Sequence, residues 1–302
     1  MARIHHLLIA SMTFIPLGVG SAAGQTPTVI DVPPASAPVS IGRNTRLTLF
    51  SGGALGTGFV AESDSFQQPA EVNIHGGTVA HSFDAGFASR VSITGGSIGD
   101  GFEAHTGSDV NISGGVFGDD FAVYDLATVD ISGGTFGDTF IVYRRNSVNI
   151  SGGAFGEHFR AYYDSIVHIT GGEFGNDFSV FPGSIVNISG GRFDRLNAIQ
   201  ESTVHLFGTE FLIGGELIPG LKPGEKFTVN VRDVNLTGTF VDGSPFDFDL
   251  SSTFSFTKDV MSEDGTLTIT LVNQVPEPSW AMILLAWAFP ICGRACFSQQ
   301  RR

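Results

Sequence analysis

Cysteine is almost absent from the chain. Its 302 residues include two cysteines, Cys292 and Cys296, and both lie close to the C-terminus. The rest of the chain can therefore form neither a disulfide nor a thiolate metal site. Basic residues are also scarce, with 16 Lys and Arg against 30 Asp and Glu, which gives a net charge of −14. Nucleic acid and anionic lipid are poor partners for such a chain, because their negative charges would be repelled.

Glycine and phenylalanine, by contrast, are abundant. The chain has 40 glycines and 27 phenylalanines, and 42% of its residues are hydrophobic. A disordered chain would carry far fewer apolar residues. This composition is typical of many short strands that are joined by glycine turns around an aromatic interior.

A repeat of fixed length runs from Val72 to Phe211. Its clearest mark is a Gly-Gly pair that returns every 19 residues. The pairs are Gly76-Gly77, Gly95-Gly96, Gly114-Gly115, Gly133-Gly134, Gly152-Gly153, Gly171-Gly172 and Gly190-Gly191. A fixed period of this length is typical of a solenoid, in which each unit buries its apolar side against its neighbours.

The positions of the repeat, counted from Val72 as position 1, each predict a structural role. Positions 1 and 3 are Val or Ile, so strand alternation sends both inward. Positions 8, 12 and 14 carry further apolar residues, including a column of phenylalanines at position 12, and complete the interior. Corners are expected at the Gly-Gly pair of positions 5 and 6, at positions 9 and 10, and near the small or polar residue at position 18. The pattern therefore predicts three short strands and three corners per coil.

We predict an all-β fold: a β-solenoid (parallel β-helix) with 19-residue coils over residues 47–211. The first coil carries five extra residues within Glu62–Glu71, which are expected to loop outward. A propeller is the alternative, but its blades need about 40 residues and neighbouring units do not alternate. Residues 212–274 lose the repeat and keep strand-like alternation. Because a solenoid end exposes strand edges, we expect this region to be a small β-rich cap.

The two ends of the chain indicate export. Residues 1–23 have a short polar start, an apolar core and small residues at the expected cleavage position, which is typical of a secretory signal peptide. The alternative, a membrane anchor, is disfavoured because Pro16 interrupts a short apolar run. Residues 24–46 are rich in proline and are predicted to form an extended linker. Residues 275–302 combine a proline-rich break, a short hydrophobic helix and a basic end.

The tail carries a recognisable motif. Pro276, Glu277 and Pro278 precede the hydrophobic stretch and the final arginines. This arrangement resembles the PEP-CTERM protein-sorting signal, and the Gly-Gly-x-Phe-Gly-Asp array resembles repeats of exported planctomycete proteins. The resemblance implies processing by an exosortase in the inner membrane of a Gram-negative-type bacterium. It further implies transient anchoring there by the C-terminal segment alone, followed by delivery to the cell surface or extracellular matrix.

An acidic column at position 10 is a candidate cation site. It consists of Asp100, Asp119, Asp138 and Glu157. Stacked carboxylates repel one another unless water or a cation separates them, and calcium suits such oxygen ligands. The spacing partly resembles the nonapeptide calcium repeats. The alternative is that these carboxylates are solvated turn residues and that the protein has no cofactor.

A polar face at positions 2 and 4 is a candidate recognition surface. Alternation sends these side chains outward, which would produce a flat Asn/Ser surface suited to exopolysaccharide or surface glycans. Its clearest members are Asn111, Ser113, Asn149, Ser151, Asn187 and Ser189. The alternative is a structural ladder of stacked side chains. At position 15, His105, three tyrosines and Phe181 form a column that could stack on sugars or only on itself.

Catalytic residues are not predicted. Polysaccharide lyases and glycosidases of β-helix fold need a placed pair of carboxylates in a groove, whereas here every coil carries nearly the same residues. The sequence also lacks the signatures of Ser/His/Asp or Cys/His catalysis and of a phosphate-binding loop. We therefore expect a structural or adhesive surface protein. A carbohydrate-binding or polysaccharide-degrading β-helix protein remains the alternative.

Overall fold

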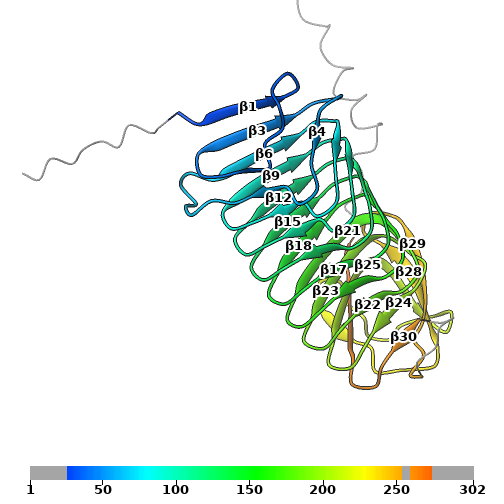
Figure 1. Ribbon diagram of the computed structural model, residues 1–302. Helices are drawn as coiled ribbons and strands as arrows, with labels where there is room; N and C mark the ends of the chain where they lie inside the picture. Colours follow the sequence, from blue (N-terminus) through cyan, green and yellow to red (C-terminus); the bar gives the residue numbers. More distant parts are fainter. Residues whose placement is uncertain (1–25, 254–258, 274–302) are drawn as a thin grey trace, which may run out of the picture.

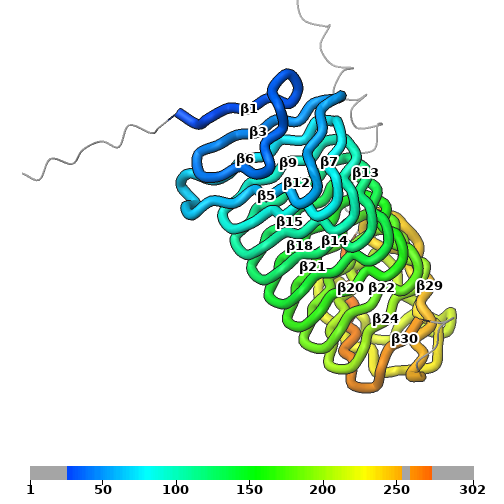
Figure 2. The backbone as a smooth tube through the Cα atoms, in the orientation of Figure 1, coloured from blue at the N-terminus to red at the C-terminus, as the bar shows by residue number. Residues whose placement is uncertain are grey.

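The computed structural model describes residues 26–253 and 259–273. Among these residues there is no helix that is long and apolar enough to cross a membrane. The predicted signal peptide (1–23) and the sorting segment (275–302), with its hydrophobic helix, lie outside the described residues. What the structure shows is an all-β chain that winds into a parallel β-solenoid of about nine coils (Figures 1 and 2).

Each coil begins with a strand of the first sheet, which contains 21 strands in all. These opening strands are β1 (Thr28–Val32), β3 (Thr45–Leu49), β6 (Ala70–Ile74), β9 (Ser89–Ile93), β12 (Asp109–Ile112), β15 (Thr128–Ile131), β18 (Ser147–Ile150), β21 (Ile166–Phe174), β23 (Ile185–Phe193) and β25 (Thr203–Ile213).

A two-residue strand follows the Gly-Gly corner and belongs to the same sheet. These strands are β4 (Ala54–Leu55), β7 (Thr78–Val79), β10 (Ser97–Ile98), β13 (Val116–Phe117), β16 (Thr135–Phe136) and β19 (Ala154–Phe155). In β21 and β23 the two parts of the coil merge into one long strand.

The coil returns through a second sheet of 10 strands. They are β2 (Ser40–Ile41), β5 (Val60–Ala61), β8 (Asp84–Ala85), β11 (Glu103–Ala104), β14 (Phe121–Val123), β17 (Phe140–Val142), β20 (Phe159–Ala161), β22 (Phe178–Val180), β24 (Leu196–Ala198) and β30 (Val260–Met261). The two sheets face each other, and their inward side chains form the core.

The register confirms the predicted period of 19 residues. Val91 pairs with Val110, Val110 with Val129 and Val129 with Val148, so each residue lies beside its equivalent in the next coil. The extra residues lie between β5 and β6, in the second coil of the structure. Ala61 pairs with Ala85 and Ala70 pairs with Ser89, so the step from 61 to 70 has five more residues than the step from 85 to 89 in the next coil. The predicted insertion is therefore confirmed.

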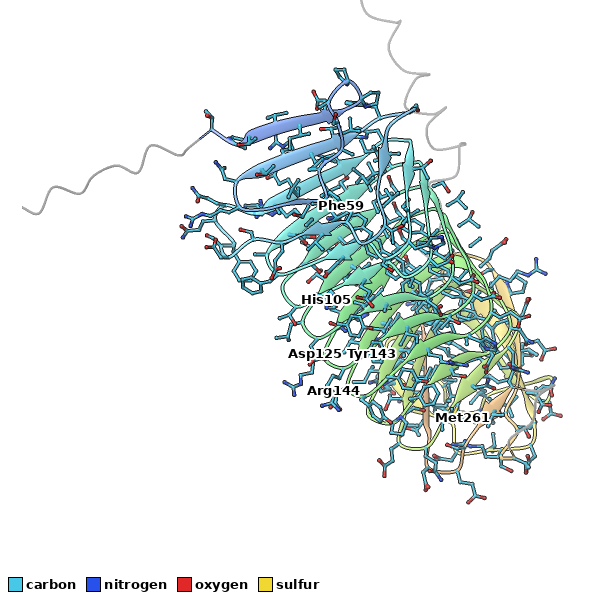
Figure 3. The ribbon with its side chains drawn as sticks, viewed as in Figure 1. Phe59, His105, Asp125, Tyr143, Arg144 and Met261 are labelled. Atoms are coloured by element: carbon cyan, nitrogen blue, oxygen red, sulfur yellow. The ribbon has the colours of Figure 1, made fainter. Side chains whose placement is uncertain are left out.

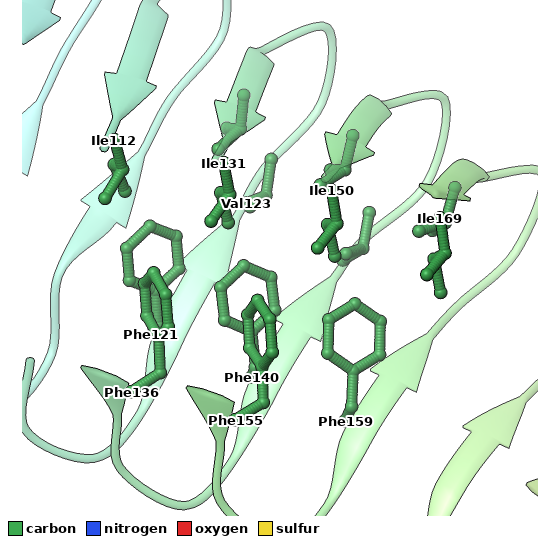
Figure 4. Close-up of a cluster of buried hydrophobic side chains, with 14 of the residues drawn as sticks. Ile112, Phe121, Val123, Ile131, Phe136, Phe140, Ile150, Phe155, Phe159 and Ile169 are labelled. Carbon is green, nitrogen blue, oxygen red and sulfur yellow. The ribbon is translucent and has the colours of Figure 1, made fainter. Parts of the chain in front are cut away.

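The core consists of stacked columns, as the sequence predicted. Rings at position 12, Phe121, Phe140 and Phe159, stack face to face with centroids 4.5 and 4.9 Å apart (Figure 4). The position-8 rings Phe136 and Phe155 form a second column, 4.7 Å apart, and meet the first column edge-on. Edge-to-face and offset contacts are the favoured geometries of aromatic pairs. All five rings are at most 5% exposed.

The Gly-Gly corner uses its two glycines for different reasons. The second glycine has a positive φ, for example 102° in Gly115, which is unfavourable for a residue with a Cβ. The first glycine has an ordinary φ, but a Cβ on Gly114 would lie 2.6 Å from the carbonyl oxygen of Thr94. The predicted corner is confirmed, and close stacking on the previous coil explains its first glycine.

The predicted linker over residues 24–46 is wrong over most of its length. β1 pairs in parallel with β3, and β2 pairs with β5, so these residues form the first coil. Pro33 and Pro34 lie in the loop between β1 and β2, and the β-branched segment before them supplies the strand. The solenoid therefore begins at Thr28 instead of residue 47.

Strands continue after β25, but they change direction. They are β26 (Glu216–Leu217), β27 (Lys226–Thr228), β28 (Asn235–Phe240), β29 (Pro245–Asp249), β30 and β31 (Thr266–Leu271). β28 pairs antiparallel with both β25 and β29, whereas β31 pairs in parallel with β25. Likewise, β30 pairs in parallel with β24, so both sheets gain one more parallel strand at this end.

Candidate functional site

The outward face of the first sheet carries a shallow hollow. It has a volume of about 370 Å³ and extends over five coils, from Ser92 to Thr170. The side chains at positions 2 and 4 line it, including Asn111, Ser113, Asp130, Asn149, Ser151 and His168. Four of the six predicted recognition residues, Asn111, Ser113, Asn149 and Ser151, therefore lie together as the sequence suggested.

Asn187 and Ser189, the other two predicted residues, do not line the hollow. Asn187 is half-buried, and the carbonyl oxygen of Ser189 accepts the N–H of Val241 at 2.9 Å. Val241 begins the turn between β28 and β29, and this turn packs against the Gly-Gly corner of the same coil, where Oδ2 of Asp242 accepts the N–H of Gly191 at 2.8 Å. The sequence could not predict this contact, because it joins residues that are far apart in the chain.

The polar face does not form a continuous side-chain ladder. Within the described residues, one coil-to-coil side-chain bond joins position-2 residues, from Nδ2 of Asn149 to Oδ1 of Asp130 at 2.6 Å. At position 4, the hydroxyls of Ser132 and Ser151 lie 3.4 Å from carbonyl oxygens of the preceding coil, at the long end of the hydrogen-bond range. Nδ2 of Asn111 donates within its own coil, to Oδ1 of Asp109 at 3.0 Å. Within the described residues the amide oxygens of Asn111 and Asn149 accept no hydrogen bond, so they remain available to a ligand.

The acidic column has a structural role of its own. Oδ1 of Asp100 accepts the N–H of Asp119 at 3.1 Å, and Oδ1 of Asp119 accepts the N–H of Asp138 at 2.8 Å. Asp138 accepts the N–H of Glu157 in the same way, at 2.8 Å. Each carboxylate thus satisfies a backbone donor of the next coil, with a charged acceptor that strengthens the bond.

The carboxylates of the column lie on separate coils, and Asp100, Asp119 and Asp138 each have one oxygen bonded to a backbone N–H. Among residues 26–253 and 259–273, no group of three or more His, Cys, Asp and Glu side chains is arranged to hold a metal ion. Calcium binding through the second oxygens stays a prediction.

The left-handed residue of this corner lies one place later than expected. Asp120, Thr139 and His158, all at position 11, have φ values of 62°, 66° and 66°. The sequence predicts this corner at positions 9 and 10. Position 11 carries no recognisable signal, because residues with a Cβ occupy a conformation that usually marks glycine or asparagine.

A polar network that the sequence did not reveal lies on the outer side of the second sheet. Asp177 is its centre: Oδ2 lies 2.9 Å from Nδ1 of His158, and Oδ1 accepts Oγ–H of Ser179 at 2.9 Å. Nδ2 of Asn197 also donates to Oδ1 at 2.7 Å, and a guanidinium nitrogen of Arg195 lies 3.5 Å away. Burial alone would raise the pKa of Asp177, but these hydrogen bonds and the Arg195 charge hold it below its ordinary value.

A second group of titratable side chains lies on the same sheet nearer the N-terminal end. Nε2 of His105 lies 3.1 Å from Oε2 of Glu103 and 3.5 Å from Oδ1 of Asp84. Burial raises the pKa of Asp84; the nearby His105 lowers it, and the charges of Glu103 and Glu62 raise it further. Glu103 and His105 lie two residues apart in one coil, and the stacking of coils brings Asp84 of the preceding coil beside them.

The aromatic column at position 15 is closed to sugar rings along its length. His105, Tyr124 and Tyr143 stack with centroids 4.8 Å apart and interplanar angles of 6° and 7°. Their faces cover one another, so a ligand can reach only ring edges. Figure 3 shows His105 and Tyr143 on one side of the rod. Of the two interpretations of this column, the structure favours mutual packing.

Comparison with known proteins adds no further assignment. No family model, curated protein or solved structure matches this chain significantly. The function of the chain is therefore inferred from its residues and their geometry.

Proposed function

We propose that this chain is an exported structural or adhesive protein of the cell surface or extracellular matrix. The observation that carries the proposal is the polar hollow of about 370 Å³ that extends over five coils. A rod with a repeated, outward-facing recognition surface suits contact with a long polymer, because each coil offers similar groups at the strand spacing of about 4.8 Å.

Neutral glycans are the partner class that fits this surface best. The side chains of Asn111, Asn149 and Ser151 provide both donors and acceptors without a net charge, which suits sugar hydroxyls. Asp130, which also lines the hollow, would disfavour an anionic polymer, as would the net charge of −14. We therefore favour an uncharged exopolysaccharide or surface glycan.

The proposed localisation of the protein rests on its two terminal segments. The PEP-CTERM resemblance of Pro276, Glu277 and Pro278 supports sorting by an exosortase, and the signal-like segment 1–23 supports export. On this proposal the C-terminal segment anchors the protein in the membrane, and cleavage then releases the rest of the chain.

The strands after β25 are proposed to cap the solenoid. An open solenoid end would present unpaired backbone groups that invite aggregation. The hairpin of β28 and β29 runs antiparallel to β25, and Phe240 and Phe246 pack at 4.4 Å on this end of the core. Antiparallel pairing interrupts the parallel stacking and so would stop further growth of the sheet.

Glycan binding by the full chain tests the recognition role. Asn149→Arg together with Ser132→Arg should fill the hollow and weaken binding to a glycan array by about tenfold or more. Thr135→Arg is the matched control, because Thr135 is exposed on the next strand of the same coil and does not line the hollow.

The outcomes separate the alternatives. Loss of glycan binding in the variant with Asn149→Arg and Ser132→Arg, with unchanged binding by Thr135→Arg, supports the proposal. An absence of binding to every neutral polysaccharide would leave a purely structural role. Depolymerisation of a polysaccharide by the wild-type chain would instead favour the polysaccharide-degrading alternative and contradict the proposed role.

A further inference from the structure

One corner of the rod exposes apolar side chains on four of its coils. Phe66 is 59% exposed, Phe87 36%, Leu126 58% and Tyr163 51%. All four lie in the loops that lead from the second sheet back to the first, Phe66 in the insertion between β5 and β6. Large apolar side chains that are exposed along one corner can mark an interaction site.

These loops stack on one another as the strands do. β8 pairs with β11, β11 with β14 and β14 with β17, each shifted by one coil. The N–H of Gly107 donates to the carbonyl oxygen of Leu126 at 3.1 Å, which joins two neighbouring corners directly. The exposed side chains therefore follow one line along the rod, which we call the corner strip (Phe66, Phe87, Leu126, Arg144, Arg145 and Tyr163).

The N-terminal end of the corner strip is aromatic and acidic. The rings of Phe66 and Phe87 pack at 4.8 Å with an interplanar angle of 62°, so they do not cover each other's faces fully. Glu62 and Asp64 adjoin them, and together with Phe87 these two carboxylates line an open hollow of about 770 Å³. Asp64 also forms an exposed ion pair with Arg43 of its own chain at 3.6 Å, whereas Glu62 forms no ion pair within the described residues. Carboxylates beside an aromatic pair are suited to a guanidinium, which can both stack on a ring and pair with a carboxylate.

The other end of the corner strip is basic. Arg144 and Arg145 are both exposed, and within the described ranges neither guanidinium forms a hydrogen bond or an ion pair. Figure 3 shows Arg144 on the same side of the rod as Asp125, one coil away. Two unpaired cations side by side are unusual in a chain with a net charge of −14.

The two ends complement each other in a copy that runs in the opposite direction. Phe87 and Arg144 both occupy position 16 and lie three coils apart, or about 14 Å at the strand spacing. A twofold axis halfway between them passes between Gly107 and Leu126. An isologous contact about this axis would place each arginine pair on the aromatic and acidic end of the other copy.

We propose that the corner strip is a self-complementary surface through which two copies of this chain pair side by side and antiparallel. The arginines of each copy then contact Phe66, Phe87 and the carboxylates of the other, twice over. Leu126 packs near the axis, against the Phe66 ring that lies over Gly107 in the facing copy. The hollow of the first sheet lies on a different face, so this pairing is independent of glycan binding and leaves the hollow open.

Sedimentation velocity of the full chain over a range of concentrations measures the pairing. Arg144→Glu with Arg145→Glu should weaken dimerisation by about tenfold or more, because it sets like charges against Glu62 and Asp64. Adding Glu62→Arg and Asp64→Arg to the same chain should restore it. Arg192→Glu is the matched control, because Arg192 is equally exposed and lies outside the corner strip.

A zero-length crosslink gives a second, direct measurement. In the Arg144→Lys variant, carbodiimide should join the introduced ammonium to Glu62 or Asp64 of another copy, which mass spectrometry identifies. Residue 144 lies four coils from Glu62 within one chain, or about 19 Å, which excludes the same link inside a single copy. A monomeric wild-type chain would overturn the proposal. So would a dimer that the charge reversals leave unchanged, which is the result expected if the chain associates through its C-terminal segment.

Discussion

Oδ1 of Asp119 accepts the backbone N–H of Asp138 at 2.8 Å and occupies the space that a Cβ on Gly137 would need. The same relationship joins Asp100 to Gly118 and Asp138 to Gly156. The glycine at position 9 and the acidic residue at position 10 are therefore coupled across coils. This coupling explains why the two residue types recur together in the repeat.

Removing one carboxylate of the column should destabilise the solenoid modestly. We expect Asp119→Ala to lower the free energy of unfolding by about 1–3 kcal/mol, because the N–H of Asp138 loses a charged acceptor. Urea denaturation measures the change. Asp194→Ala is the control, since Asp194 is exposed and its carboxylate accepts no hydrogen bond within the described residues; equal effects of the two substitutions would argue against the ladder.

The Gly-Gly corner should tolerate alanine poorly. Gly115→Ala forces a Cβ into a backbone with φ of 102°, and we expect a loss of about 1–2 kcal/mol in the free energy of unfolding. Gly56→Ala should be close to neutral, because Gly56 has no positive φ and open space around its Cβ position. Thermal unfolding of both variants tests the difference, and similar melting temperatures would contradict it.

The phenylalanine column should be the main source of stability. Phe140 contacts stacked neighbours on both sides and two further rings edge-on, so Phe140→Ala should cost about 3–5 kcal/mol. Val116→Ala, at a side chain 56% exposed, should change stability by less than about 0.5 kcal/mol. Chemical denaturation distinguishes the two. If Phe140→Leu costs much less stability than Phe140→Ala, the side-chain volume at this position contributes more than ring stacking does.

Asp177 should make the solenoid sensitive to acid. Its pKa is lowered on folding, so its contribution to stability is present above its ordinary pKa of 3.8 and is lost as the pH falls through the lower folded value. Asp177→Asn should therefore flatten the loss of stability between about pH 4 and about pH 2. Denaturant unfolding at several pH values measures this slope, and an unchanged slope would show that other carboxylates control acid unfolding.

Calcium should have little effect on the described body of the protein. Asp100, Asp119 and Asp138 each already accept a backbone N–H, and their neighbours lie one coil away, so few oxygens can converge on one ion. We expect the melting temperature to be the same in calcium and in chelator. A saturable rise in melting temperature that Asp119→Asn abolishes would instead establish the column as a cation site.

The C-terminal segment should control delivery and leave folding unaffected. Deletion of residues 275–302, or replacement of Pro276, Glu277 and Pro278 by alanine, is expected to abolish processing and surface exposure. Fractionation with an antibody against the solenoid measures both. Surface delivery that persists without the segment would contradict the PEP-CTERM interpretation.

Much of this architecture was determined by the sequence itself. The sequence has a strict 19-residue period with Val and Ile at positions 1 and 3 and Phe at position 12. These apolar side chains are buried together when equivalent residues stack between coils, as the structure shows. The inward columns, the Gly-Gly corners and the five-residue insertion follow from that local regularity. So does the outward direction of Asn111, Ser113, Asn149 and Ser151.

Only the tertiary structure decided how residues of different coils meet. The sequence predicts a linker at Thr28–Val32 because the residues around it are rich in proline. The strand forms because it pairs with β3, a partner that only the fold brings beside it. The contact of Val241 with Ser189 and the network around Asp177 do not recur from coil to coil, so the repeat pattern could not predict them. The pattern predicts that Asp119 stacks on Asp138, but only the structure shows that the carboxylate accepts the backbone N–H. A repeat specifies which side chains point outward, whereas stacking and the return of the chain determine which of them stay accessible.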